Sequence, residues 1–120
     1  MAAIKVKRTY ASAEVSDGYR VLVDRLWPRG IRKEDAHIDV WLKEVAPSTE
    51  LRKWFHAHLD QWEAFSKRYA AELKAGEGFL ALKALAGKHA HITLLYASRD
   101  EEHNHALLLA KWLVTGVPAP

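Results

Sequence analysis

At residues 19–30 the chain reads YRVLVDRLWPRG, a stretch that indicates both a strand and a site. The continuous apolar run Val21-Leu22-Val23 is typical of a strand buried on both faces of a parallel sheet. Charged residues follow at once, in Asp24, Arg25 and Arg29, and such charges are costly at the end of a buried strand unless they are paired or used. Ligands of open α/β sheets bind at the carboxyl ends of the strands. The stretch therefore predicts where a site lies, but not its chemistry.

The composition is that of an ordinary globular protein. Of 120 residues, 49% are hydrophobic and 28% are charged, which predicts a single domain over residues 1–120. The chain has no cysteine, so disulfides, thiol catalysis and thiolate metal sites are excluded. It shows neither a signal peptide nor an apolar run near the ~18 residues of a membrane helix. We therefore expect a cytoplasmic protein with no membrane partner.

The spacing of apolar residues predicts three strands, at residues 4–10, 19–24 and 91–97. Helical patterns separate the second strand from the third, so these two strands are expected to be parallel and joined by a right-handed crossover. The predicted fold is α/β, a small three-layer domain with about three strands and four helices in the order β-β-α-α-α-β-α. Its second and third strands would end at the same edge of the sheet.

Four helices are expected between and after these strands. The first is indicated by Ile38, Trp41, Leu42 and Val45, which follow the i, i+3, i+4, i+7 spacing, with Asp35 as its cap. The strongest pattern predicts one long helix over residues 49–74, with its core-facing stripe at Leu51, Trp54, Phe55, His58, Leu59, Trp62, Phe65, Tyr69 and Leu73. The other two helices are predicted at residues 79–86, closed by Gly87, and at residues 102–114.

Two charged motifs meet if the strands are arranged in this way. Asp24-Arg25 follows the second strand, and Ser98-Arg99-Asp100 follows the third. Guanidinium binds phosphate or carboxylate with two parallel N–H donors, and the start of the last helix would add backbone donors. The candidate ligand-binding residues from this reasoning are Arg25, Trp27, Arg29, Arg52 and Arg99. The candidate catalytic residues are Asp24, Asp100 and His105, with His105 as the proton carrier.

Each of these assignments has a structural alternative. Asp24 and Asp100 could neutralise the arginines in an ion network, or their proximity could raise the pKa of one of them and suit it to acid–base work. Trp27 could pack a rigid turn before Pro28, or form a stacking wall for a planar ligand. The helical His-x-His pairs point their rings nearly opposite ways, so we predict no metal site and no cofactor.

The alternative function is nucleic-acid binding or regulation through the basic N-terminal third of the chain. The formal net charge is only +3, but the N-terminal third is rich in basic residues, which are Lys5, Lys7, Arg8, Arg20, Arg25, Arg29, Arg32 and Lys33. Neither helix-turn-helix spacing nor an aromatic RNA-binding strand motif accompanies them. A third reading is a protein-interaction module or homodimer without a ligand, which an exposed Trp27 or Trp112 would favour.

Four motifs together resemble the YeaO-like branch of the uncharacterised-protein family 488. They are Val21 to Gly30, Trp41-Leu42-Lys43, Ala46-Pro47-Ser48 and Leu94 to Asp100, and the resemblance extends over residues 5–113. It implies a compact α/β domain in a cytoplasmic bacterial protein. The resemblance also adds Asn104 to the ligand-binding candidates. The motif positions that it supports are Asp24, Arg25, Trp27, Pro28, Arg29, Gly30, Trp41, Lys43, Pro47, Ser48, Arg52, Trp54, Tyr96, Asp100 and Asn104.

The chain differs from longer members of that family in the segment after the last predicted strand. Longer members carry cysteines and a Cys-His-Arg step after the last strand, where this chain has Asn104-His105-Ala106. Thiol chemistry is therefore not carried over. The favoured function is binding of a small phosphate- or carboxylate-bearing ligand, and a hydrolase or transferase is the reaction class if the protein is an enzyme. The sequence predicts neither the ligand nor the oligomeric state.

Overall fold

Four parallel strands form one sheet in the order β1-β4-β2-β3. The structure, a computed structural model, describes residues 2–118. The strands are β1 (Ala3–Arg8), β2 (Tyr19–Leu22), β3 (Val40–Trp41) and β4 (His91–Tyr96). Leu94 of β4 lies between Val6 and Val21. The α/β class and the parallel pairing of the predicted second and third strands are confirmed, and β3 is the strand that the sequence did not reveal.

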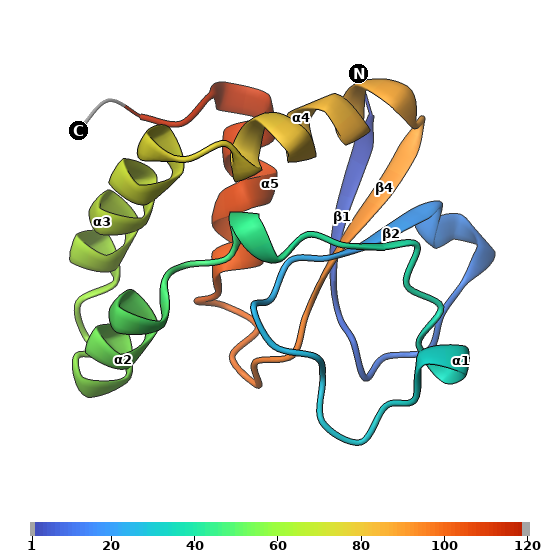
Figure 1. Ribbon diagram of the computed structural model, residues 1–120, viewed down its shortest axis with the longest axis horizontal. Coiled ribbons are helices and arrows are strands. Elements are labelled where there is room, and N and C mark those ends of the chain that lie inside the picture. The colour runs from blue at the N-terminus through green and yellow to red at the C-terminus, as the bar shows by residue number, and fades with distance from the viewer. Residues whose placement is uncertain (1, 119–120) are drawn as a thin grey trace.

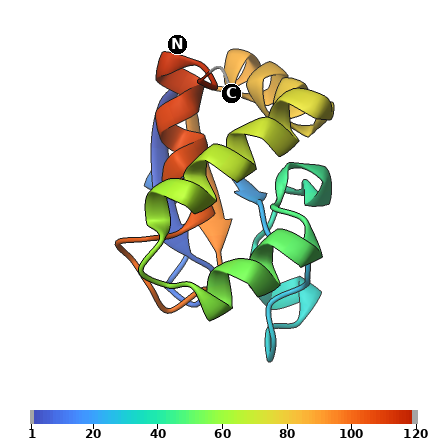
Figure 2. The same ribbon diagram turned by 90° about the vertical axis from the view of Figure 1, so that its left-hand side faces the viewer.

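Five helices flank this sheet among residues 2–118. They are α1 (Lys33–Ala36), α2 (Thr49–Ala57), α3 (Trp62–Ala75), α4 (Gly78–Lys88) and α5 (His105–Thr115). Figure 1 shows α2, α3 and α5 to one side of the strands, with α4 across their upper end. The other side carries only α1 and the loop that contains the 3₁₀ turn η1 (Val15–Asp17). Figure 2 shows α3 crossing in front of α5 and the sheet, with α2 below it.

The two faces of the sheet differ because side chains alternate along each strand. Val21 and Leu94 point toward the helices and belong to the main core. On the opposite face, Arg20 pairs in register with Thr93 of β4, and both are buried. Asp17 of η1 lies under this face with its side chain fully buried. One face therefore packs on the main apolar core, and the other carries a buried polar cluster beside its own buried leucines.

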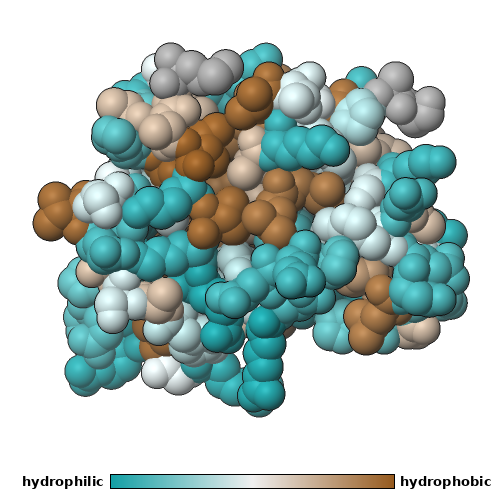
Figure 3. All heavy atoms as spheres, turned by 180° about the vertical axis from the view of Figure 1, so that it is seen from behind, coloured by the Kyte–Doolittle hydropathy of each residue, from teal (hydrophilic) through white to brown (hydrophobic). Residues whose placement is uncertain are grey.

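An edge of the sheet is open at the back of the molecule. β1 is an edge strand that packs against α5, and Figure 3 shows a hydrophobic area on that back face. Val114 of α5 is 60% exposed, whereas Trp112 is only 4% exposed. Trp112 is therefore buried, whereas an interaction module would be favoured by its exposure.

Tyr69 joins the helices to the sheet edge from inside the core. It lies on the inner side of α3, fully buried, with its ring against Trp112 at 5.7 Å between centroids. Its hydroxyl donates a hydrogen bond to the carbonyl oxygen of Val45. Burial raises the pKa of Tyr69 well above its ordinary value, with the charge of Glu72 adding to the effect. The hydroxyl therefore stays protonated and keeps the proton that it donates to Val45.

The Tyr69→Phe variant should lose stability although its ring still packs. The substitution leaves the Val45 carbonyl without its donor, which costs roughly 1–3 kcal/mol for a buried group. We expect Tm in a thermal melt to fall by several degrees. The control is Tyr19→Phe, because the Tyr19 hydroxyl has no hydrogen bond among the described residues. An equal shift in both variants would contradict the role given to the Val45 bond.

The predicted helix through Ile38 and Val45 is wrong. Asp39 N–H donates to the carbonyl of Arg20 at 2.9 Å, and its carboxylate accepts from Arg20 N–H at 2.8 Å. Val40 then pairs with Val21, and the 3₁₀ turn η2 (Lys43–Val45) follows. Pairing with the exposed edge of β2 therefore outweighs a helical stripe that is only two turns long.

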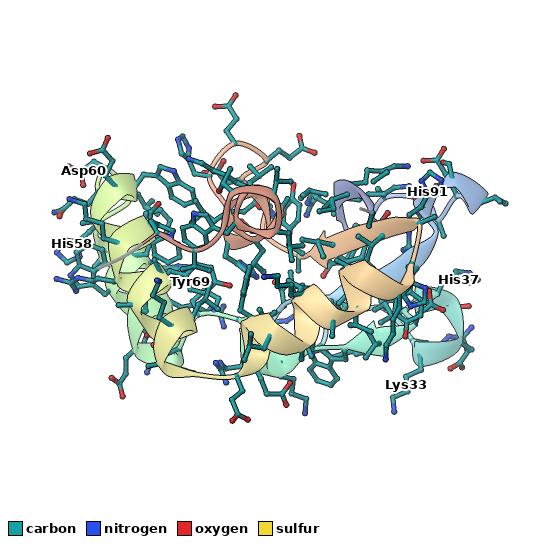
Figure 4. All side chains as sticks on the ribbon, turned by 90° about the horizontal axis from the view of Figure 1, so that it is seen from above. Lys33, His37, His58, Asp60, Tyr69 and His91 are labelled. Atoms are coloured by element: carbon teal, nitrogen blue, oxygen red, sulfur yellow. The ribbon has the colours of Figure 1, made fainter. Side chains whose placement is uncertain are left out.

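The predicted long helix over residues 49–74 is also wrong, because it breaks at His58. The His58 ring Nδ1 lies 2.7 Å from the carbonyl oxygen of Trp54 and closes α2. Leu59, expected in the buried stripe, is 69% exposed. The chain turns here, and α3 begins at Trp62. Figure 4 shows His58 and Asp60 together at this end of the helical layer, away from Tyr69.

Two predicted helix ends also shift. Gly87 lies inside α4, which continues to Lys88 and ends at His89. α5 begins at His105, with Asn104 as its N-cap. The reason for the later start is Asp100, whose carboxylate accepts from the N–H groups of the two residues before Asn104 and keeps that segment in a turn. Within residues 2–118, no helix is long and apolar enough to cross a membrane.

Candidate functional site

A cleft of about 540 Å³ lies at the carboxyl ends of β2 and β4, against α2 and α3. Its volume falls within the range of roughly 300–1,000 Å³ that is typical of small-molecule sites. The nine candidate residues predicted from the sequence all line it, namely Asp24, Arg25, Trp27, Arg29, Arg52, Arg99, Asp100, Asn104 and His105. The parallel strands therefore bring the two charged motifs together at one edge of the sheet.

Asp24 joins three elements at this edge. One carboxylate oxygen accepts from the N–H of Ala97, just after β4, at 2.8 Å. The other lies 3.1 Å from Nε2 of His105, the first residue of α5. The same Nε2 lies 2.9 Å from the carbonyl oxygen of Val23, which can only accept. Nε2 therefore carries a proton, and Nδ1 is the position at which His105 could take up another.

Arg25 is already occupied by the protein. Its guanidinium donates to the carbonyl oxygens of Pro47 at 3.2 Å and Ala46 at 3.1 Å. These bonds hold the segment before α2 against the end of β2. Arg25 thus forms the wall of the cleft, and its charge contributes to the cleft even though its donors are largely used.

Trp27 and Asn104 also have their polar atoms satisfied. The Trp27 indole N–H donates to the carbonyl of Ile31 at 2.6 Å, and its ring packs edge-on against Trp41. The Asn104 amide oxygen caps α5 by accepting from Leu107 N–H, and its NH₂ group donates to the carbonyl of Asp100. Trp27 therefore presents only its ring to the cleft, and Asn104 holds the loop after β4.

The pKa of Asp100 is lowered, in contrast to the alternative in which two nearby aspartates raise the pKa of one of them. Hydrogen bonds from the backbone N–H groups of His103 and Glu102 lower the pKa of Asp100 below its ordinary value. The His103 ring lies 3.7 Å away on the same carboxylate. Asp100 is thus ionised at neutral pH, and the geometry fits a loop-ordering role better than that of a general acid.

Three arginines of the cleft have no internal partner. Within residues 2–118, no hydrogen bond or ion pair holds the guanidinium of Arg29, Arg52 or Arg99. Among the same residues, neither Asp24 nor Asp100 forms an ion pair with an arginine. An ion network of these aspartates and arginines, which the sequence left open as an alternative, is therefore not observed among the described residues, and three guanidiniums of the cleft have no internal partner.

Aromatic side chains of α2 and α3 line the helix side of the cleft. Phe55, Trp62 and Phe65 are all part of the lining. The Trp62 ring lies 5.7 Å from Phe55 and 5.4 Å from Phe65, nearly parallel to the latter. The sequence predicts these residues as core, and all three belong to the core or pack against it. Phe65 is buried, but Phe55 and Trp62 are half-buried, and the helix break at His58 is what turns them toward the cleft.

A second cavity of about 420 Å³ lies on the other side of the sheet, lined by Thr9, Arg20, Gly30 and His37 among others. Its buried guanidinium is fully used, because Arg20 donates to Asp17 and to the carbonyl of His37. The cleft at the strand ends, which has free guanidiniums, is therefore the stronger candidate site. No group of three or more residues that could hold a metal occurs among the described residues.

Most basic residues of the N-terminal third are internally paired. Lys5, Lys7 and Arg20 all contact Asp17. Arg8 donates to the carbonyl of Ser98, and Arg32 pairs with a neighbouring aspartate. The cations that contact carboxylates are thus partly neutralised, whereas Arg8, like Arg25, donates to backbone carbonyl oxygens and keeps its charge.

The structure is that of a small α/β protein, and the comparisons with known sequences show that the chain belongs to the DUF488 family. The family model that matches residues 3–118 is described as the inactive DUF488-N3 subclade. Among its relatives, the chain is 51% identical to an uncharacterised protein of Escherichia coli (strain K12), YeaO, over 110 residues that cover 92% of this chain and 96% of that one. The resemblance seen in the sequence is thus confirmed.

The relationship extends to mycobacteria. The chain is 41% identical to an uncharacterised protein of Mycobacterium tuberculosis (strain ATCC 25618 / H37Rv) over 110 residues, or 92% of each chain. An uncharacterised protein of Mycobacterium bovis (strain ATCC BAA-935 / AF2122/97) gives the same identity and coverage. No solved structure matches the chain.

Proposed function

We propose that the cleft binds a small anionic ligand that bears a phosphate or carboxylate group. The observation that carries this proposal is the convergence of Arg29, Arg52 and Arg99, none with an internal partner among residues 2–118, on one cleft. Guanidinium groups hold such anions through paired N–H donors. Arg25 and Asn104 give the cleft its shape, and the side chain of Asp24 holds the ends of β2 and β4 together.

The protein acts by binding rather than by turnover in this proposal. The matching family model is described as inactive, and both Asp24 and His105 are engaged in contacts that stabilise the edge of the sheet. A hydrolase or transferase is the second candidate, favoured by the 3.1 Å contact between Asp24 and His105. In an enzyme of this kind, Nδ1 of His105 would be the atom that exchanges a proton with the ligand.

A thermal-shift screen tests the binding proposal. Wild type and Arg29→Ala are compared against phosphate, sugar phosphates, nucleotides and carboxylic acids. A ligand at 100 times its Kd stabilises the folded state by about 2.7 kcal/mol, which raises Tm measurably. The matched control is Arg32→Ala, an exposed arginine of the same loop whose partners lie outside the cleft. We expect a ligand-induced shift in wild type and control that is lost in Arg29→Ala.

Two results would contradict the proposal or change it. A ligand shift that survives unchanged in Arg29→Ala, or no shift with any anion, argues against an anion site in this cleft. Product formation from a bound ligand, followed by NMR and abolished in His105→Gln, would replace binding by catalysis. The screen therefore separates a protein that binds an anion from one that does not, and the NMR assay separates a binding protein from an enzyme.

A further inference from the structure

The charge around the cleft matches that of a phosphate monoester. Among the described residues, four arginines and two aspartates line the cleft, a surplus of 4 − 2 = 2 positive charges when the histidines are neutral. A phosphate monoester carries about −1.5 to −2 charges at pH 7. A single carboxylate would leave much of this surplus unbalanced. The donors free to hold the phosphate are those of Arg29, Arg52 and Arg99, since Arg25 is bound to backbone carbonyls.

The cleft also has an aromatic wall that an anion alone does not need. Phe55 and Trp62 are half-buried and contribute ring surface to the lining from α2 and α3. Trp62 is fixed by Phe65, which stacks on it, and by His103, whose ring meets it edge-on at 5.2 Å. A fixed, partly exposed indole is the kind of surface on which nucleobases stack. The arginines of the two loops and the rings of the helices therefore suit the two ends of one ligand.

We propose that the ligand is a nucleoside monophosphate, with its phosphate at Arg29 and Arg99 and its base on the wall formed by Phe55 and Trp62. This inference rests on the proposed function, since it names the class of anion. The volume of about 540 Å³ lies in the range of small-molecule sites. Trp27, whose indole N–H is already bound to Ile31, supplies a second apolar surface at the loop end.

The base is bound by stacking rather than by reading its edge. The polar atoms of Trp27 and Asn104, which would be available to recognise a base, are engaged within the protein. Stacking tolerates any base because every base has a π-face. Adenosine, guanosine, cytidine and uridine monophosphates are therefore expected to bind with affinities within a few-fold of one another.

Calorimetric titration of the wild-type chain with matched fragments tests the inference. The probes are AMP, ribose 5-phosphate, which lacks the base, adenosine, which lacks the phosphate, and adenosine 5′-carboxylate. AMP should bind roughly tenfold or more tightly than ribose 5-phosphate, because loss of one stacked base weakens binding by about that factor. It should also bind more tightly than adenosine and the carboxylate.

Each outcome bears on one part of the inference. Equal affinity for AMP and ribose 5-phosphate overturns the aromatic part and leaves the anion site of the proposed function intact. Equal affinity for AMP and adenosine 5′-carboxylate overturns the choice of phosphate. Binding of adenosine as tight as that of AMP, or no binding of any probe, overturns the anion site as well. The failures of the two proposals are therefore distinguishable.

A tryptophan variant locates the base. Trp62→Leu should weaken AMP about tenfold and leave ribose 5-phosphate unchanged. The matched control is Trp54→Leu, because Trp54 stacks on His58 outside the lining of the cleft. Indole N–H signals of the wild type in NMR give the same information without a variant, since AMP should shift the signal of Trp62 and not that of buried Trp112. An unshifted Trp62 signal overturns the stacking site.

Discussion

Replacing Asp17 with alanine is expected to destabilise the fold by about 3–5 kcal/mol, because it leaves a buried charge without its partner. The Asp17 side chain is fully buried and pairs with Arg20, which is itself only 5% exposed. The same carboxylate accepts from Lys5 at 3.1 Å, from Lys7 at 3.2 Å and from the N–H of Glu14 at 3.0 Å. No other carboxylate of the described residues is held by as many donors.

Urea unfolding at neutral pH measures this loss. The matched control is Asp35→Ala, which removes the ion pair of Asp35 with Arg32, in which both side chains are more than half exposed. Exposed pairs of this kind contribute about 1 kcal/mol or less. The prediction fails if the two variants unfold at the same urea concentration, since burial would then make no difference to the value of the pair.

The effect of Asp17 on stability should also depend on pH. Burial alone would raise the pKa of Asp17, but the backbone N–H of Glu14 and the cations of Lys5, Lys7 and Arg20 together lower this pKa well below its ordinary value. A lowered pKa in the folded state means stability that is present above the ordinary value of 3.8 and is lost as the pH falls below it. The stability difference between wild type and Asp17→Ala should therefore shrink below about pH 4. A difference that stays constant down to pH 2 would contradict this account.

The parts of the fold that the sequence predicts are those with strong local signals. The apolar run that begins at Val21 and the β-branched and aliphatic residues of 91–96 form β2 and β4 as expected, although β2 ends at Leu22. Because both strands are parallel neighbours, the meeting of Asp24 with the segment after β4 followed from topology alone. This is why the place of the cleft could be inferred before any side chain was positioned.

The elements that were mispredicted depend on contacts between distant residues. Val40 and Trp41 become a strand because the edge of β2 is open beside them, which no local pattern reveals. The break after α2 depends on His58, whose ring closes the helix by contacting a carbonyl one turn back. A stripe of helical periodicity continues through such a break, so spacing alone cannot distinguish one helix from two.

The sequence likewise predicts the members of the cleft better than their roles. Arg25 and Arg29 are equivalent as sequence, yet Arg25 is bound to the carbonyls of Ala46 and Pro47 while Arg29 is free. Asn104 is a helix cap whose amide is fully used. Which guanidinium remains for a ligand depends on the carbonyl oxygens that lie nearby, and these come from segments about twenty residues away.

Gly18→Ala is the other substitution expected to have a large effect, because two independent costs add. Gly18 has φ 66° and ψ −132°, a backbone conformation that is essentially restricted to glycine. A Cβ atom there would lie 2.4 Å from the carbonyl oxygen of His91, at the start of β4. Strained conformation costs about 1–3 kcal/mol and a forced shift of packed backbone costs a similar amount. The expected loss of unfolding free energy is about 3 kcal/mol or more.

Gly87→Ala is the matched control, and its effect should have the opposite sign. Gly87 lies within α4, and a Cβ atom there meets nothing within 4 Å. Alanine in an exposed helix position is favoured over glycine by roughly 0.5–1 kcal/mol. Chemical denaturation of the two variants should therefore move the midpoint in opposite directions from wild type. If Gly18→Ala retained wild-type stability, the turn before β2 could open without cost, and the close approach of η1 to β4 would not hold Asp17 in place beneath the sheet.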